Sequence, residues 1–160
     1  MPRFESYPPA GLLLVYNYKK YFWPADRRMS RKPSLLIVDD EVSVARTLQM
    51  VFEQEGYKVA AAHSCAEALH LLNNGGRYDA IITDLNMEQP DIGLDVARAA
   101  GSLSPKPVVV ICTGYASSDN SRKALELRVD YLATKPVDLK ELVPALNRMI
   151  AHRRDLRIWT

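Results

Sequence analysis

Short apolar runs alternate with longer amphipathic segments along the chain from Ser34 onward. The runs contain little polar alternation, which is typical of strands that are covered on both faces of a sheet. The longer segments repeat their apolar residues about every 3.6 positions, which is typical of helices with one buried face. The pattern predicts five strands, at residues 35–38, 57–62, 79–83, 108–111 and 130–133.

Five helices are predicted between and after these strands, and several of their ends carry capping signals. Ser64 with Glu67 three residues later forms a capping box, and Gly56 is placed to close the first helix. Parallel strands need crossover connections, so five strand–helix units predict an α/β fold with a doubly wound parallel sheet. The predicted helices cover about residues 44–52, 64–72, 94–97, 118–127 and 138–150.

The candidate site lies at the carboxyl ends of the predicted strands, because the functional crevice of such a sheet lies outside that edge. Four of the five strands end in a residue that can take part in phosphate or metal chemistry. The strand-terminal residues are Asp39, Asp40, His63, Asp84, Thr113 and Lys135.

Three of these residues are aspartates, and carboxylates gathered at one edge repel one another unless a cation lies among them. A site made of oxygen ligands favours Mg²⁺ or Mn²⁺ over zinc. The ammonium of Lys135 suits a phosphate oxygen or a carboxylate, and Thr113 offers a hydroxyl donor. A divalent cation, an ammonium and a hydroxyl around one aspartate predict transfer of a phosphoryl group to that carboxylate.

Composition and charge exclude several other classes of protein. The chain has 160 residues, of which 48% are hydrophobic and 25% charged, so it can form one domain with a buried core. A net charge of +2 does not predict binding to nucleic acid or to an anionic membrane, and no apolar run is long enough to span a bilayer. Cys65 and Cys112 form no CxxC pair and are expected to be free thiols of a cytoplasmic protein.

Residues 1–33 form an N-terminal extension that differs from the rest, because it holds seven of the thirteen aromatic residues and shows no sustained helical or strand period. A secretory signal is rejected, since no small-residue cleavage site follows the apolar run 10–16. Three interpretations stay open: translation starts at Met29, the segment is a disordered arm, or an aromatic strip docks on the domain or on a partner. The domain itself is predicted at 34–152, followed by a short basic tail at 153–160 whose arginines are expected to be solvated.

Four short motifs resemble the signature of the response-regulator receiver domain of two-component signalling. They are VDDE at 38–41, DLNM at 84–87, TG at 113–114 and KP at 135–136, in the order and at the spacing of that family. The resemblance covers residues 34–152 and implies a flavodoxin-like (βα)5 fold with strand order 2-1-3-4-5. This order places the ends of the other four strands side by side and the second strand at the outside of the sheet. His63, at the end of the second strand, is therefore expected to be a solvated loop residue.

The resemblance assigns a role to each site residue. Asp84 matches the phosphoacceptor, Thr113 the hydroxyl that follows the phosphoryl group, and Lys135 the lysine that forms an ion pair with it. The implied donor is a phosphohistidine on a sensor histidine kinase or on a phosphotransfer protein. The implied ligands of Mg²⁺ are Asp39, acting through water, Asp40, Asp84 and the backbone carbonyl of Asn86.

The chain departs from the family pattern in the loop after the phosphoacceptor and in the fifth strand. The family usually has a proline directly after the DLNM motif, whereas residues 88–90 intervene here, so Gly93 arrives one position late and the loop is expected to be remodelled. Leu132 stands where the family often has a switch aromatic, and Tyr131 is expected to point to the opposite face of the strand. Tyr115, two residues past the threonine, is expected to hinder the water that hydrolyses the acyl phosphate.

The resemblance implies a phosphorelay receiver rather than an enzyme, with output through another protein because only residues 153–160 follow the domain. The family usually binds partners, or a second copy, through the face formed by the helix at 118–127, the strand at 130–133 and the helix at 138–150. The helix at 118–127 is polar, which fits such a signalling surface but fits a simply solvated helix equally well. Two alternative functions are a receiver-like binding module that is not phosphorylated and a haloacid-dehalogenase-type phosphatase. The second conflicts with Asn86, which occupies the second acidic position of the DxD motif that such enzymes use.

Overall fold

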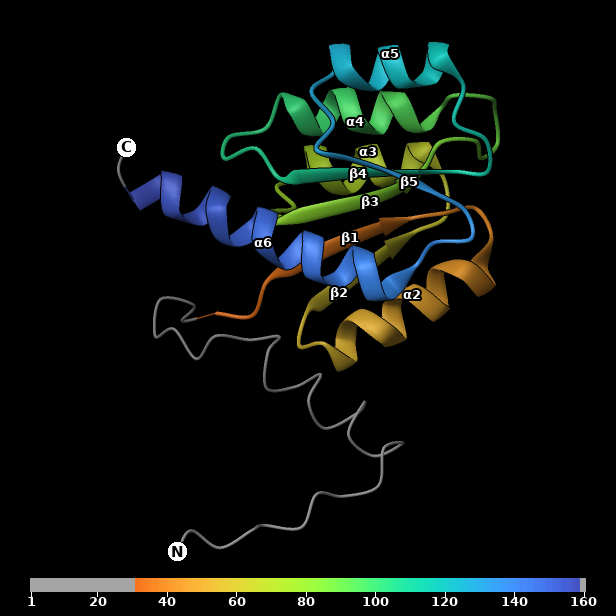
Figure 1. Ribbon diagram of the computed structural model, residues 1–160. Helices are drawn as coiled ribbons and strands as arrows, with labels where there is room; N and C mark the ends of the chain where they lie inside the picture. Colours follow the sequence, from red (N-terminus) through yellow and green to blue (C-terminus); the bar gives the residue numbers. More distant parts are fainter. Residues whose placement is uncertain (1–30, 159–160) are drawn as a thin grey trace, which may run out of the picture. The chain divides into compact units, whose positions relative to one another are not determined.

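Five parallel strands form one sheet in the order β2-β1-β3-β4-β5, with helices on both of its faces (Figure 1). The computed structural model describes residues 31–158. The strands are β1 (Ser34–Val38), β2 (Lys58–Ala62), β3 (Ala80–Asp84), β4 (Val108–Thr113) and β5 (Tyr131–Thr134). The helices are α2 (Val42–Gln54), α3 (Cys65–Asn73), α4 (Gly93–Gly101), α5 (Ser118–Glu126) and α6 (Leu139–Ile158). The predicted flavodoxin-like fold and its strand order are confirmed.

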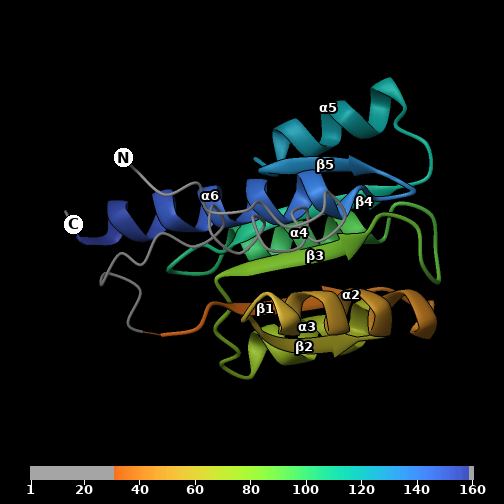
Figure 2. The ribbon, with the colours of Figure 1, turned by 60° about the horizontal axis from the view of Figure 1, so that its bottom comes forward.

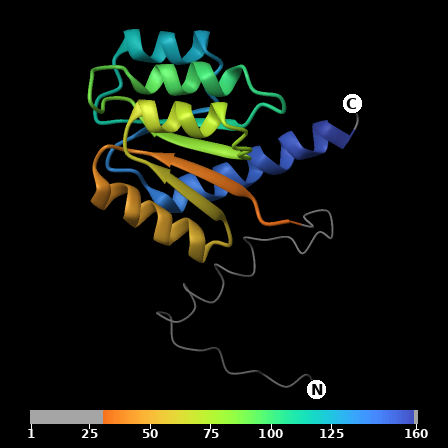
Figure 3. The same cartoon turned by 180° about the vertical axis from the view of Figure 1, so that it is seen from behind.

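The helices are divided between the two faces of the sheet. α3, α4 and α5 lie on one face, and α2 and α6 on the other (Figures 1 and 3). Figure 2 brings α2 and α6 in front of the strands. Because both faces are covered, consecutive side chains of a central strand are all shielded from water, and Leu35, Leu36 and Ile37 are 0% exposed. This layering is the physical reason for the unbroken apolar runs in the sequence.

The core is continuous across the three central strands, β1, β3 and β4. Leu36 pairs with Ile81, and Ile81 pairs with Val109, so these side chains form one row across the sheet. All three are at most 1% exposed, and burying each contributes about 2 kcal/mol. The row anchors the strands, and with them the residues at their carboxyl ends.

Several helix ends are held by the residues that the sequence indicated. The hydroxyl of Ser64 caps α3 by accepting the backbone N–H of Glu67 at 3.1 Å. The Glu67 carboxylate accepts the N–H of His63 at 2.7 Å, so the reciprocal bond of the capping box is shifted by one residue. Gly56 follows α2 with φ +88°, a left-handed conformation that favours glycine.

The last helix differs from the prediction, because residues 153–158 continue α6 instead of forming a separate tail. The prediction that the arginines of this segment are solvated is wrong for Arg153 and Arg154. The guanidinium of Arg154 lies 2.8 Å from a carboxylate oxygen of Asp79, whose side chain is 2% exposed, and Arg153 forms an ion pair with Asp130. Asp79 and Asp130 directly precede β3 and β5, so the end of α6 holds the amino ends of two strands.

Some expectations from the sequence concern other parts of the chain. The open interpretations of the N-terminal extension, with Met29 as a start, fall on residues 1–30, which lie outside the described residues. Cys65 and Cys112 are buried free thiols, as predicted. Among residues 31–158, no helix combines the length and the hydropathy that crossing a bilayer requires.

Replacing Arg154 with methionine is expected to destabilise the domain, because the buried carboxylate of Asp79 loses this cation. The expected loss is about 3 kcal/mol of unfolding free energy, as is usual when one partner of a buried ion pair is removed. The matched control is Arg98→Met, which breaks an exposed pair with Asp95 and is expected to cost less than about 1 kcal/mol. Urea unfolding measures both variants, and equal losses would contradict the role given to Arg154.

Candidate acidic phosphoacceptor site

Three aspartates converge at the carboxyl edge of the sheet. Asp39 and Asp40 follow β1 directly, and Asp84 ends β3, the neighbour of β1 in the sheet. One carboxylate oxygen from each residue lies within 4.8 Å of those of the other two. Asp39 and Asp84 are 4% and 9% exposed, whereas Asp40 is exposed, so this acidic cluster opens to solvent on the side of Asp40.

Lys135 joins the acidic cluster from the end of β5. Its ammonium lies 3.2 Å from a carboxylate oxygen of Asp84 and 3.3 Å from one of Asp39, so it bridges the two buried aspartates. The other carboxylate oxygen of Asp39 accepts the backbone N–H of Glu41 at 2.9 Å. The pairing with Asp39 is a contact that sequence reasoning missed, because nothing in the KP motif points to it.

Two opposing effects set the protonation of Asp84. Burial raises its pKa above the usual value and the charge of Asp39 adds to the rise, while Lys135 and the backbone N–H of Asn86 lower it without cancelling the rise. Burial alone would lower the pKa of Lys135, but Asp39 and Asp84 outweigh this effect and raise it. The lysine therefore stays charged, and the site brings three aspartates together with this one ammonium.

This donor set fits a divalent cation of the Mg²⁺ type. Its ligand atoms are carboxylate oxygens, which Mg²⁺ prefers, and a cation among them offsets the repulsion between neighbouring carboxylates. The exposure of Asp40 gives access to the waters that Mg²⁺ retains when it binds a protein. The ion would be held by Asp39, Asp40 and Asp84, with the backbone carbonyl of Asn86 as the further predicted ligand.

Comparison with known proteins decides the family. The profile described as "Response regulator receiver domain" matches residues 35–147, well over half of the chain. The chain belongs to the response regulator receiver family. It is similar to the transcriptional regulatory protein GlrR of Escherichia coli (strain K12), with 35% identity over 120 residues. It is also similar to the uncharacterized transcriptional regulatory protein YkoG of Bacillus subtilis (strain 168), with 32% identity over 117 residues.

Solved structures share the same domain. A CheY-like receiver domain protein from Methanospirillum hungatei JF-1 has a TM-score of 0.73 and 25% identity, over 78% of this chain and 98% of that one. A receiver domain protein from Clostridium thermocellum has a TM-score of 0.70 and 28% identity, over 78% and 98%. The alignments with GlrR and YkoG cover 74% and 72% of this chain but only 27% and 50% of those proteins. The receiver domain is therefore the part that this chain shares with its curated relatives.

The loop that follows β3 makes two polar contacts close to Asp84. The carboxylate of Glu88 accepts the backbone N–H of Cys65 at 2.8 Å, which ties the loop to the start of α3. The side-chain oxygen of Asn86 accepts the N–H of Asp91 at 2.8 Å. The sequence predicted that this loop departs from the family pattern. It did not predict the contact between Glu88 and Cys65, because no motif in the sequence marks Cys65 as a hydrogen-bond partner.

Thr113 ends β4 and is 1% exposed, with its hydroxyl engaged in a local turn. The hydroxyl donates to the backbone carbonyl of Tyr115 at 2.9 Å and accepts the N–H of that residue at 3.2 Å. It therefore has to release the carbonyl before it can donate to a phosphoryl oxygen. The Tyr115 side chain is 77% exposed beside this turn.

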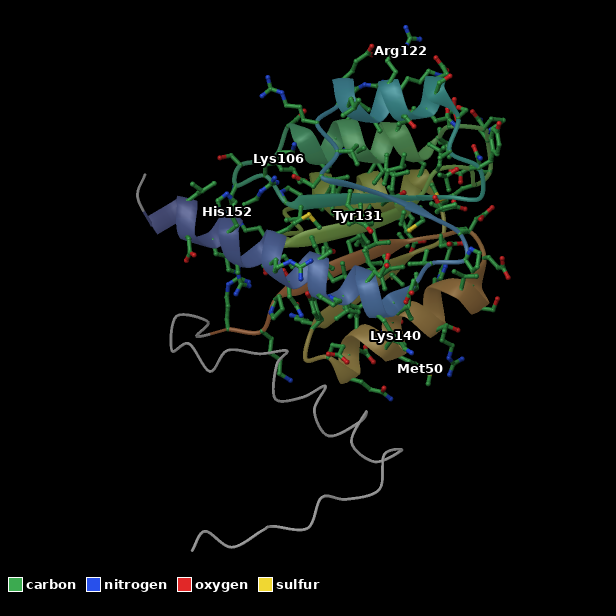
Figure 4. All side chains as sticks on the ribbon, in the orientation of Figure 1. Met50, Lys106, Arg122, Tyr131, Lys140 and His152 are labelled. Carbon is green, nitrogen blue, oxygen red and sulfur yellow. The ribbon has the colours of Figure 1, made fainter. Side chains whose placement is uncertain are left out.

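The receiver's fifth strand has no aromatic residue at the switch position. Leu132 packs against the core cluster covered by α3 and α4, while Tyr131, labelled in Figure 4, lies on the opposite face of β5. The position in β5 from which an aromatic ring could follow the Thr113 hydroxyl is therefore occupied by Leu132. His63 is exposed, as predicted, and its Nδ1 lies 3.2 Å from the backbone carbonyl oxygen of Asp39, so it borders the acidic cluster.

A largely apolar cavity of about 390 Å³ adjoins the acidic cluster, between α2 and the start of α6. Asp84 and Lys135 form part of its wall, so it belongs to the same site. Cys112 also lines the cavity, and burial raises the pKa of its thiol to about 12, which keeps this thiol protonated and unreactive at neutral pH.

Gly93, the first residue of α4, packs directly against the backbone at the end of β3. Its N–H donates to the carbonyl of Leu85 at 2.9 Å, and a Cβ at this position would lie 2.0 Å from the backbone oxygen of Asp84. A residue without a side chain is therefore required for α4 to pack against the backbone of Asp84. This glycine comes one position later in the sequence than in the family pattern, but its contact with Asp84 was not predicted.

Gly93→Ala is expected to destabilise the domain by about 2 kcal/mol or more, because the added methyl group forces α4 and the backbone of Asp84 apart. Mg²⁺ binding should weaken as well, since Asp84 moves relative to Asp39. Gly101→Ala, at the other end of α4, is the matched control: nothing lies within 4 Å of its added Cβ, so stability should stay equal or rise slightly. Thermal unfolding with and without Mg²⁺ measures both, and a Gly93→Ala variant as stable as Gly101→Ala would refute the packing argument.

Proposed function

We propose that Asp84 accepts a phosphoryl group from a phosphohistidine of a sensor histidine kinase or a phosphotransfer protein, in a reaction that depends on Mg²⁺. The observation that carries the proposal is the acidic cluster, with three aspartate oxygens within 4.8 Å of one another and the Lys135 ammonium 3.2 Å from Asp84. Membership of the receiver family supports it, because response regulators act in two-component signalling. The complete set of site residues argues against a module that is never phosphorylated.

In the proposed step, a carboxylate oxygen of Asp84 attacks the phosphorus atom. Its O–P bond forms as the P–N bond to the donor imidazole breaks, and the leaving ring takes up a proton. Mg²⁺ bound at Asp39, Asp40 and the Asn86 carbonyl would supply positive charge that offsets repulsion between the carboxylates and the phosphoryl oxygens. The Lys135 ammonium, already beside Asp84, turns to a phosphoryl oxygen without leaving Asp39.

Thr113 connects this step to the loop before α5. When its hydroxyl donates to a phosphoryl oxygen, the carbonyl of Tyr115 loses a hydrogen bond and the loop can rearrange. The acyl phosphate would thus favour one of two receiver conformations. We propose that a downstream protein, or a second copy of the chain, distinguishes these conformations at the face formed by α5, β5 and α6.

The proposal describes a signalling protein of the cytoplasm and not an enzyme that turns over phosphate esters. The buried free thiols Cys65 and Cys112 suit a reducing compartment. Asn86 stands where a haloacid-dehalogenase-type phosphatase would use its second aspartate. Release of phosphate from small phosphate esters in repeated cycles would contradict this part of the proposal.

Incubation with acetyl phosphate and Mg²⁺ is expected to add one phosphoryl group to the wild-type chain and none to Asp84→Asn, because the amide is not a phosphoryl acceptor. The mass of the intact protein reports the modification, and chelation of Mg²⁺ should abolish it. Asp95→Asn, an exposed aspartate of α4, is the control and should behave as wild type. A wild-type chain that stays unmodified, or equal modification of Asp84→Asn, would refute the proposal.

Tyr115→Ala is expected to speed the loss of the acyl phosphate about threefold, a change of less than about 1 kcal/mol in activation free energy, because it removes bulk that hinders water. The decay is followed by intact mass after the phosphodonor is removed. Leu125→Ala removes another exposed apolar side chain, on α5 away from the phosphoacceptor, and should leave the rate unchanged. Equal decay rates in Tyr115→Ala and wild type would show that the ring does not shield the site.

A further inference from the structure

Lys123 on α5 forms an ion pair with the loop that carries the predicted ligand Asn86. Its ammonium lies 3.1 Å from a carboxylate oxygen of Asp91 and 2.8 Å from one of Asp119 in its own helix. The Lys123 and Asp91 side chains are 38% and 35% exposed, so water screens the pair only in part. The pair thus connects α5 with the loop between β3 and α4.

Asp91 is linked in turn to the phosphoacceptor position. Its N–H donates to the side-chain oxygen of Asn86 at 2.8 Å, and the backbone of Asn86 interacts with the Asp84 carboxylate and lowers its pKa. Asp91 also has φ +59°, a left-handed conformation that aspartate tolerates better than most residues. Asn86 and Asp91 therefore lie between Asp84 and Lys123 in a series of polar neighbours.

α5 has little apolar packing to hold it in one position. Ala124 is the buried residue of this helix, whereas Leu125 is 76% exposed. Figure 1 shows α5 at the margin of the domain, beyond α4. The position of a helix with so narrow a buried face depends strongly on its polar contacts. A partly shielded ion pair is therefore sufficient to bias where α5 lies.

We propose that the Asp91–Lys123 pair couples the state of the phosphoacceptor site to the position of α5, in the absence of an aromatic residue at Leu132. The inference rests on the proposed function of Asp84. Binding of a cation at the Asn86 carbonyl, or of a phosphoryl group at Asp84, reorients the Asn86 peptide and moves Asp91 with it. Lys123 then keeps only its partner within α5, and the helix is released from the loop.

Thermodynamic linkage gives this coupling a sign. If binding at the site weakens the pair, then loss of the pair must strengthen binding at the site by the same factor. Removing either Asp91 or Lys123 should therefore tighten Mg²⁺ binding. Direct electrostatics predicts opposite effects instead, with tighter binding without the lysine and weaker binding without the aspartate. The effect of the Asp91 substitution separates the two explanations.

The test uses the full chain with Asp91→Asn, Lys123→Met and the double variant, and measures the dissociation constant of Mg²⁺ by calorimetric titration. Both single variants are expected to bind Mg²⁺ about two- to fivefold more tightly, and the double variant no more tightly than the singles. Arg122→Met is the matched control, because Arg122 pairs with Asp119 and points away from the domain (Figure 4). It should leave Mg²⁺ binding unchanged.

Amide NMR of residues 118–126, before and after phosphorylation with acetyl phosphate, provides the second measurement. The shifts that phosphorylation induces should be less than half as large in Asp91→Asn and Lys123→Met as in wild type and Arg122→Met, because the helix is already released. Wild-type Mg²⁺ affinity and wild-type shifts in phosphorylated Asp91→Asn would overturn the coupling and leave the proposed function intact. A wild-type chain that is never phosphorylated would refute the proposed function, and the Mg²⁺ titration would still decide the coupling.

Discussion

Repulsion among three carboxylates at one edge of a parallel sheet is the constraint on which the rest of this receiver domain depends. Asp39 and Asp84 are buried, so water screens their charges poorly, and the Lys135 ammonium offsets only part of the repulsion. The remaining repulsion favours a divalent cation at the site and so supports the proposed phosphoryl transfer to Asp84. In a cluster of the same residues on the surface, water would screen the carboxylates from one another, and the cluster would favour a bound cation less strongly.

The sheet holds the acidic residues of the site in place, whereas the elements around the site are held more weakly. Side chains such as Ile81 in the centre of the sheet fix the ends of β1, β3 and β4, so the acidic residues cannot move apart to relieve their repulsion. The loop from Asn86 to Asp91 and the weakly packed helix α5 are held by polar contacts instead. Polar contacts of this kind can be exchanged at small cost, which is the reason that the proposed coupling runs through these elements.

The two edges of the sheet also differ in their electrostatics. At the amino edge, Arg154 and Arg153 from the end of α6 neutralise Asp79 and Asp130 one to one. At the carboxyl edge, one lysine faces three aspartates. The ion pairs of the amino edge therefore stabilise the fold, while the excess of acidic side chains at the carboxyl edge supports the proposed cation site.

The five strands and the aspartates at their ends follow from the sequence pattern, because burial on two faces leaves apolar runs and strand ends leave polar residues such as Asp84 directly after them. The order of the strands in the sheet was implied only by the resemblance to the receiver family. The contacts of Lys135 with Asp39, of Arg154 with Asp79 and of Lys123 with Asp91 arise only in the folded chain. Their partners are 96, 75 and 32 residues apart, and no local pattern links charges at such separations. The requirement for Gly93 likewise comes from a backbone contact across two elements. Local periodicity determined which elements form, and close packing decided which of their charges meet.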